Sequence, residues 1–231
     1  MPLTPLRLED VPPTYLYVPP GEHDVLPLVL LGHGAHLNKD DQFMQILAKT
    51  FCRSVPAAVA LMDCPGHGER RIEGSTDEEF DADVQRRMSD PEYYAELEVD
   101  WLAVEKAARA ADARIAGPTG YAGFSMGAMI GFSIVGDLAP VKAAVFALGG
   151  LTPHEGRNAI IKSGAQRLGD REVLMLNMTR DEYFDMPGAL DLFEAIPGPN
   201  RMGVWPGGHT DIGPEAIKMA VEFFQRTLAD R

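Results

Sequence analysis

The residues best suited to chemistry in this 231-residue chain are a serine and its two flanking glycines, at positions 123–127 in the order Gly-x-Ser-x-Gly. The run 118–124 before the serine is predicted to be a strand, and a helix is predicted after it. We therefore expect Ser125 on a tight strand-to-helix turn that holds its hydroxyl clear of the backbone. A Cβ at Gly123 or Gly127 would crowd the neighbouring strand and the helix start. The spacing thus predicts a nucleophilic serine.

A serine hydroxyl is a poor nucleophile unless a base takes its proton and a carboxylate orients that base. In open α/β sheets, ligands bind outside the carboxyl ends of the strands. The polar residues expected at those ends are His33 to His36, Asp63 to His67, Ser125, His154, Asp181, Glu182 and His209. Among them, His209 follows the last predicted strand in a glycine-rich loop, and Asp181 follows the strand 173–177.

Together these positions resemble the α/β-hydrolase fold, specifically its small serine carboxylesterases and dienelactone-hydrolase-like members, from about Val25 to Leu228. The resemblance implies Ser125 as nucleophile, Asp181 as acid and His209 as base, in the chain order that this fold requires. Residues 179–182 (Thr-Arg-Asp-Glu) resemble the family's Gly-Thr-x-Asp-Glu turn, although Asn-Met precedes them where His-Gly is usual. Glu182 and Asp185 remain alternative acids.

An oxyanion hole is the next requirement, because negative charge develops on the carbonyl oxygen in the transition state. Its first donor is expected to be the backbone N–H of Met126, directly after the nucleophile. The second is expected from Ala35, which follows His33-Gly34 after the strand 25–31. The His33 side chain is interpreted as structural, a hydrogen-bonding group that holds this loop.

Three other interpretations of these residues compete with the hydrolase. A dinucleotide fingerprint beginning at Gly32 fails, because Leu37 occupies the position of its third glycine. His33, His36 and His67 could be metal ligands, but no Cys/His pair elsewhere completes such a site. Cys64 is expected to be a packed thiol. Dienelactone hydrolases proper use Cys at the elbow, whereas this chain has Ser125.

The remaining pattern predicts a mostly parallel, doubly wound sheet flanked by helices, formed by a single domain over 1–231. A helix capped by Asn38 is expected after the first buried strand, another helix from about Leu97, and a closing helix from Pro214. The predicted strands are 14–19, 25–31, 57–63, 118–124, 141–148, 173–177 and 202–205.

The segment 69–96 does not fit the strand–helix alternation and is predicted to be a short helical insertion in place of a large cap. Thr76 to Glu79 form a capping box, and Phe80, Val84 and Met88 recur at helical spacing before Asp90-Pro91. We expect this helix to cover the site, with its apolar stripe facing the acyl pocket. The alternative is a helix docked on the protein body. The pocket candidates are His36, Phe80, Val84, Met88 and His154.

Composition limits the setting and the partners. The net charge of −13 and the lack of a basic cluster argue against nucleic acid. Two cysteines, no signal-peptide pattern and no apolar run of membrane-spanning length favour a cytoplasmic protein without a membrane partner. Self-association into a homo-oligomer stays open.

The sequence therefore predicts a serine hydrolase that cleaves a small-molecule carboxylic ester through an acyl-enzyme, with no cofactor and no metal. A lactonase or thioesterase with the same triad is the nearest alternative. The alternative from outside the enzymes is a receptor for small ligands that has the hydrolase fold but no catalytic activity. A receptor, however, would place no demand on Asp181 or His209.

Overall fold

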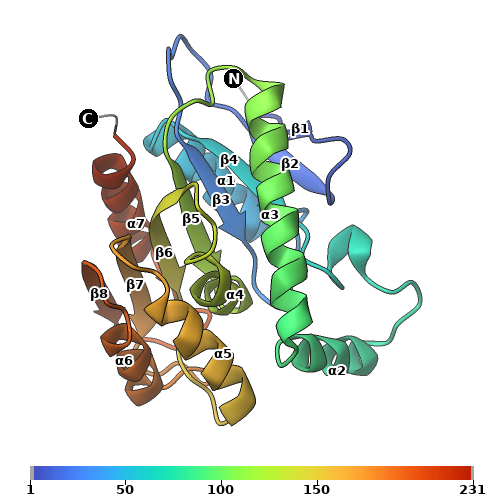
Figure 1. Ribbon diagram of the computed structural model, residues 1–231, viewed down its shortest axis with the longest axis vertical. Helices are drawn as coiled ribbons and strands as arrows, with labels where there is room; N and C mark the ends of the chain where they lie inside the picture. The colour runs from blue at the N-terminus through green and yellow to red at the C-terminus, as the bar shows by residue number, and fades with distance from the viewer. Residues whose placement is uncertain (1–2, 230–231) are drawn as a thin grey trace.

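The computed structural model describes residues 3–229, and a single eight-stranded sheet runs through them (Figure 1). The strand order is β1-β2-β4-β3-β5-β6-β7-β8, in which β1 and β2 are antiparallel to their neighbours and the others run parallel. The strands are β1 (Leu6–Arg7), β2 (Thr14–Tyr17), β3 (Leu28–Gly32), β4 (Ala58–Met62), β5 (Thr119–Phe124), β6 (Val141–Ala147), β7 (Glu172–Met178) and β8 (Asn200–Trp205). The predicted mostly parallel sheet is confirmed.

Helices cover both faces of the sheet, as expected for strands that are apolar on both sides. Helices α1 and α7 pack on one face, and α3, α4 and α5 pack on the other. The α-helices are α1 (Gln42–Ser54), α2 (Asp77–Arg87), α3 (Pro91–Ala111), α4 (Met126–Ile134), α5 (Glu155–Gln166), α6 (Met186–Glu194) and α7 (Pro214–Thr227). No helix in the described range 3–229 is both long and apolar enough to span a bilayer.

The strands divide their side chains between two core clusters with the period of two that a strand imposes. In β3, Leu28 and Leu30 join the cluster under α3 and α4, whereas Val29 and Leu31 join the cluster under α1 and α7. All five residues of this strand are buried. The sheet is therefore a rigid central layer, and the loops at its carboxyl edge are held in fixed relative positions.

Two helix starts differ from the sequence prediction. The α1 N-cap is Asp41, whose carboxylate accepts the N–H groups of Phe43 and Met44, whereas Asn38 caps the preceding turn through the N–H of Asp40. Helix α3 begins at Pro91 rather than near Leu97, with Asp90 as its N-cap. Proline suits a first helical position because it lacks only an N–H that would have no intrahelical partner there. The last residues of segment 69–96 are therefore the first turns of α3.

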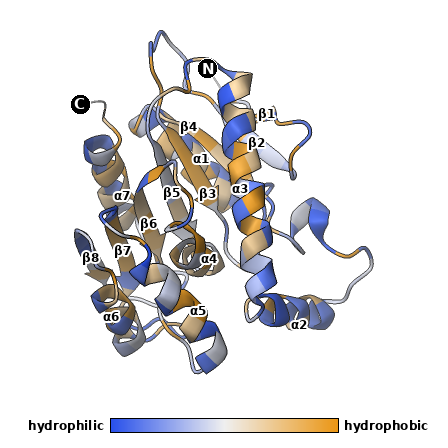
Figure 2. Ribbon diagram, in the orientation of Figure 1, coloured by the Kyte–Doolittle hydropathy of each residue, from blue (hydrophilic) through white to orange (hydrophobic). Residues whose placement is uncertain are grey.

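Helix α2 forms where the capping box predicts it, with the Thr76 hydroxyl and the Glu79 carboxylate each accepting the other residue's N–H. The helix is predominantly hydrophilic, in contrast to the apolar central strands (Figure 2). The apolar residues Phe80 and Val84 of this helix, and its C-cap Met88, are nevertheless all buried in the larger core cluster. The insertion is thus both docked on the body and, as described below, part of a cavity wall.

Candidate active site

Ser125 lies on the turn between β5 and α4 in a conformation that few non-glycine residues adopt, with φ 53° and ψ −115°. Its N–H donates to the Ala147 carbonyl at 2.9 Å, which fixes the turn to the neighbouring strand. A Cβ on Gly127 would lie 2.5 Å from the Gly32 carbonyl oxygen, and one on Gly123 would overlap the Gly127 carbonyl. Both glycines are therefore required by close backbone approach, and the strain is held by the surrounding sheet.

The structure brings the three residues predicted for the triad into one hydrogen-bonded chain. The His209 Nε2 atom lies 2.9 Å from the Ser125 Oγ atom, and His209 Nδ1 lies 2.8 Å from Asp181 Oδ2. With Nδ1 as the donor to the carboxylate, Nε2 is left to accept the serine proton. The rings of Tyr183 and Phe184 pack beside the imidazole, with centroids 4.9 and 5.7 Å away.

Asp181 is buried and is held as an anion by three donors. Burial raises the pKa of this carboxyl group. The hydrogen bond from His209 and the N–H groups of Tyr183 and Phe184, at 2.9 and 3.0 Å, more than offset that effect and lower it overall. Asp181 can therefore orient the imidazole and stabilise its protonated form.

The two alternative acids have other partners. The Glu182 carboxylate accepts the backbone N–H of His209 at 2.9 Å, so it fixes the loop that carries the histidine. Asp185 is the N-cap of α6 and accepts the N–H of Gly188 at 2.8 Å. Neither carboxylate reaches the imidazole ring, so Asp181 is the carboxylate placed to orient it.

His33 holds the loop after β3, in keeping with its structural interpretation. Its Nε2 atom accepts the Cys64 N–H at 3.0 Å, so Nδ1 carries the proton and donates to the Gly34 carbonyl at 2.8 Å. Burial lowers the pKa of this imidazole to about 4, which keeps it neutral at pH 7. Because a peptide unit is planar and trans, fixing the Gly34 carbonyl also fixes the Ala35 N–H, which points the opposite way.

The loop after β3 passes directly beside the nucleophile, since a Cβ on Gly34 would lie 3.7 Å from the Ser125 Cβ. Met126 is the first residue of α4, where an N–H has no intrahelical acceptor. Within residues 3–229, neither the Ala35 N–H nor the Met126 N–H donates a hydrogen bond. Both N–H groups are therefore free to donate to another acceptor.

A cavity of about 690 Å³ opens above Ser125 and His209 and is mostly apolar at its walls. Four of the five predicted pocket residues line it: His36, Val84, Met88 and His154. The cavity wall also includes Gln85, Leu148, Thr152 and Arg157, which were not predicted from the sequence. Leu148 has a φ of 59°, a value that is unusual for a non-glycine residue and that no sequence pattern predicts here.

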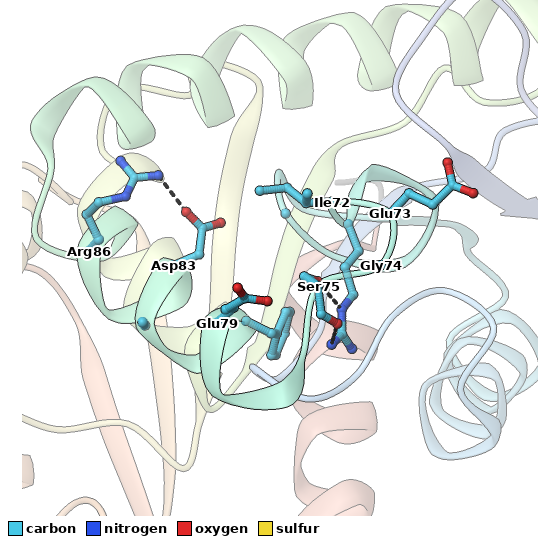
Figure 3. A pocket seen from close by; sticks show the side chains of 11 residues that line it. Ile72, Glu73, Gly74, Ser75, Glu79, Asp83 and Arg86 are labelled. Carbon is cyan, nitrogen blue, oxygen red and sulfur yellow. Dashed lines mark hydrogen bonds and ion pairs between the residues drawn. The ribbon is translucent and has the colours of Figure 1, made fainter.

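Phe80 was expected to face the acyl pocket, and this prediction is wrong. It lies one turn before Val84, and its ring packs against His67 and His36, at centroid distances of 5.1 and 5.8 Å. Phe80 instead lines a separate, open hollow between α2 and the preceding loop, where Asp83 pairs with Arg86 (Figure 3). Phe80 and Met88 lie about two helical turns apart, so the stripe meets more than one surface and its first member lies outside the cavity.

The metal-site alternative for the histidines finds no support in the geometry. Both ring nitrogens of His33 are engaged by backbone groups. No cluster of three or more His, Cys, Asp or Glu side chains in residues 3–229 is arranged to hold a metal ion. Cys52 and Cys64 are both buried and unpaired, and burial raises the pKa of the Cys64 thiol. Cys64 is therefore a packed thiol.

A scan against protein-family models and a search of curated proteins find no match. Solved structures match over nearly the whole chain. A cold-adapted esterase from an Arctic intertidal metagenomic library is 25% identical, with 98% of this chain and 93% of that chain covered and a TM-score of 0.75. TT1662 from Thermus thermophilus is 18% identical, with both chains fully covered and a TM-score of 0.74. Dienelactone hydrolase from Anabaena variabilis is 16% identical, with 97% and 94% covered and a TM-score of 0.63.

The sheet order, the strained serine turn and these neighbours define the class of protein. The chain has the α/β-hydrolase fold.

Proposed function

We propose that the protein is a serine hydrolase that cleaves carboxylic esters through an acyl-enzyme intermediate. The observation that carries the proposal is the chain of hydrogen bonds from Ser125 through His209 to Asp181, at 2.9 and 2.8 Å, on the wall of a largely apolar cavity. The esterase and dienelactone hydrolase neighbours are consistent with it.

The proposed reaction has two halves. Ser125 Oγ attacks the ester carbonyl while His209 Nε2 takes its proton, and the Ala35 and Met126 N–H groups receive the developing oxyanion. Collapse of the tetrahedral intermediate breaks the bond to the alcohol, which leaves with the proton held by His209. Water then attacks the acyl-enzyme with His209 again as base, and the acid is released as Ser125 regains its proton.

A fluorophosphonate probe, followed by an ester screen, tests this proposal. Probe labelling confined to Ser125, together with hydrolysis of para-nitrophenyl esters, is the expected result, because an activated serine is required for both. A protein that binds small esters without labelling or turnover would instead be the receptor. Parallel rates on matched lactones and thioesters decide whether a simple ester is the preferred substrate.

Asp181→Asn should lower kcat by about 10⁴-fold, a smaller loss than removing Ser125, because it disturbs the histidine tautomer and leaves both reacting groups in place. Glu182→Gln should stay within about threefold of wild type, since the amide oxygen can still accept the His209 N–H. Steady-state kinetics on one activated ester measures both variants. The reverse ranking would assign the acid to Glu182.

Val84→Ala and Met88→Ala should each shift the preferred acyl chain toward longer esters, because both side chains line the cavity. One or two lost methylene-sized contacts change discrimination between neighbouring chain lengths by about 10-fold. Relative kcat/KM across para-nitrophenyl esters from acetate to decanoate measures the shift.

Phe80→Leu is the matched control on the same helix, since Phe80 is buried but outside that cavity. It should lower the melting temperature without changing the order of the esters. If the Val84 and Met88 variants keep the wild-type order of ester chain lengths, these side chains of α2 stabilise the core and do not select the acyl group.

A further inference from the structure

Arg157 is a buried cation without an acidic partner. Its side chain belongs to α5, leaves the residue only 8% exposed, and lines the cavity that contains Ser125. Its Nη2 atom donates to Gln85 Oε1 at 2.6 Å, whereas Nε is buried with no acceptor and Nη1 makes no hydrogen bond to any described residue. Among the described residues 3–229, no carboxylate acts on this guanidinium; burial lowers its pKa, and Tyr94 is the one neighbouring group that opposes that effect.

A buried guanidinium without a counter-charge destabilises the folded protein unless a ligand supplies the missing charge. A guanidinium stays charged at neutral pH, and burying a charge without a counter-charge is strongly unfavourable. The chain contains 34 acidic residues, and even the less deeply buried Arg70 and Arg109, with side chains 20% and 30% exposed, are paired with carboxylates. Arg157 is also the one Lys or Arg among the described residues of the cavity wall.

A second polar group on the wall of the same cavity is likewise without a hydrogen-bond partner. The Thr152 Oγ1 atom is buried without a hydrogen bond, and Thr152 lines the same cavity. Its backbone is fixed by Asn158, which accepts the Thr152 N–H at 3.0 Å and donates to its carbonyl at 2.6 Å. The loop is therefore held rigidly while its hydroxyl donor stays free, which is the preorganisation expected of a ligand site.

The acidic groups that share the cavity wall are already engaged. Glu182 accepts the His209 N–H, and Asp41 caps α1. Neither compensates Arg157, and both would repel an anion placed beside them. An anionic ligand group is thus directed toward the α5 side of the cavity, where the guanidinium and the Thr152 hydroxyl lie.

From this geometry we infer that the natural substrate is an ester that carries a carboxylate, which Arg157 and Thr152 bind while Ser125 attacks the ester carbonyl. The inference rests on the proposed function, because it places both ends of one substrate in one cavity. An Arg–carboxylate contact can be bidentate, so it supplies orientation as well as attraction. The insertion helix takes part indirectly, since Gln85 of α2 positions the guanidinium.

The experiment compares charged esters with neutral esters of matched size. The acyl-side pair is mono-para-nitrophenyl glutarate and para-nitrophenyl valerate, and the alcohol-side pair is meta-acetoxybenzoate and phenyl acetate. Wild type should favour the charged member of at least one pair in kcat/KM. Arg157→Met should reduce that preference by at least about 30-fold, because truncating one partner of a desolvated charge pair is expensive. Its rate on the neutral ester should remain within a few-fold of wild type.

Two further variants keep the result interpretable. Arg86→Met removes an equal charge from α2 at an exposed position outside the cavity, and should leave every ratio unchanged. Arg157→Lys retains the charge but not the planar fork, and should fall between wild type and Arg157→Met. If Arg157→Met does not fold, a loss of preference in Arg157→Lys with its melting temperature unchanged still supports the inference.

Binding of the dicarboxylic product separates this inference from the proposed function. Calorimetric titration of glutarate into Ser125→Ala, with and without Arg157→Met, needs no turnover. Charge preference and glutarate affinity that are both independent of Arg157 would overturn the inference while leaving ester hydrolysis intact. Arg157-dependent glutarate binding in a protein that neither hydrolyses esters nor reacts with fluorophosphonate would instead overturn the proposed function alone.

Discussion

Ser125→Ala and His209→Ala should each abolish ester hydrolysis, with kcat reduced by about 10⁶-fold and the fold unchanged. The two groups act as one unit, because the Ser125 hydroxyl is reactive only while His209 Nε2, 2.9 Å away, can take its proton. The double variant should therefore lose little more than either single variant. Burst and steady-state kinetics on an activated ester measure the losses, and circular dichroism checks the fold.

The matched control is His154→Gln, at a histidine that lines the same cavity but makes no hydrogen bond to Ser125. It should change KM by a few-fold at most and leave the turnover rate near that of wild type. Retention of more than a tenth of wild-type turnover in His209→Ala would remove His209 from the role of base. Losses that multiply in the double variant would show that the two residues act independently.

The positions of the three proposed triad residues could be predicted, because they depend on the topology of the sheet more than on side-chain packing. Ser125, Asp181 and His209 follow β5, β7 and β8, and parallel strands present their carboxyl ends at one edge of the sheet. Residues 84 and 28 positions apart in the chain therefore meet there. The two glycines at positions 123 and 127 indicated the tight turn directly, because the close backbone contacts that exclude a Cβ there involve the turn itself.

The cavity wall could be predicted only in part, because it depends on how α2 and α5 dock. The apolar stripe of α2 was evident, but the sequence does not give the rotation that turns Val84 and Met88 into the cavity and Phe80 out of it. Arg157 lies in the first turn of α5, between the polar residues Glu155 and Asn158, so the local sequence is that of an exposed helix start. Its burial depends on contact with Gln85, a residue 72 positions away, and no local pattern encodes that contact.

Lys39 is the centre of a cluster of three carboxylates in the segment that follows the proposed oxyanion loop. Its side chain is fully buried, and its ammonium lies 2.8 Å from Asp40, 3.3 Å from Asp63 and 2.6 Å from Glu69. The Asp63 carboxylate is also fully buried and accepts the N–H groups of Lys39 and Glu69 at 2.8 and 3.0 Å. The cluster thus joins the segment after β3 to the segment after β4.

Lys39→Met should lower the free energy of unfolding by about 3–5 kcal/mol, because removing one partner leaves the Asp63 carboxylate buried without its counter-charge. Urea denaturation at pH 7, with the m-value checked for constancy, measures the loss. Arg7→Gln is the matched control, since it breaks an ion pair to the same Glu69 carboxylate at side-chain exposures of 50% and 40%. It should cost no more than about 1 kcal/mol.

The pH dependence of that loss separates lost charge pairing from lost packing. Hydrogen bonds from Arg7 and then Lys39 lower the pKa of Glu69 from 4.5 to about 2. A carboxyl group with a lowered pKa stabilises the folded state above pH 4.5, and that contribution disappears as the pH falls toward 2. The difference between wild type and Lys39→Met should therefore shrink between pH 7 and about pH 3. An equal difference at both pH values would mean that Lys39 stabilises the protein through its buried methylene stem and not through its charge.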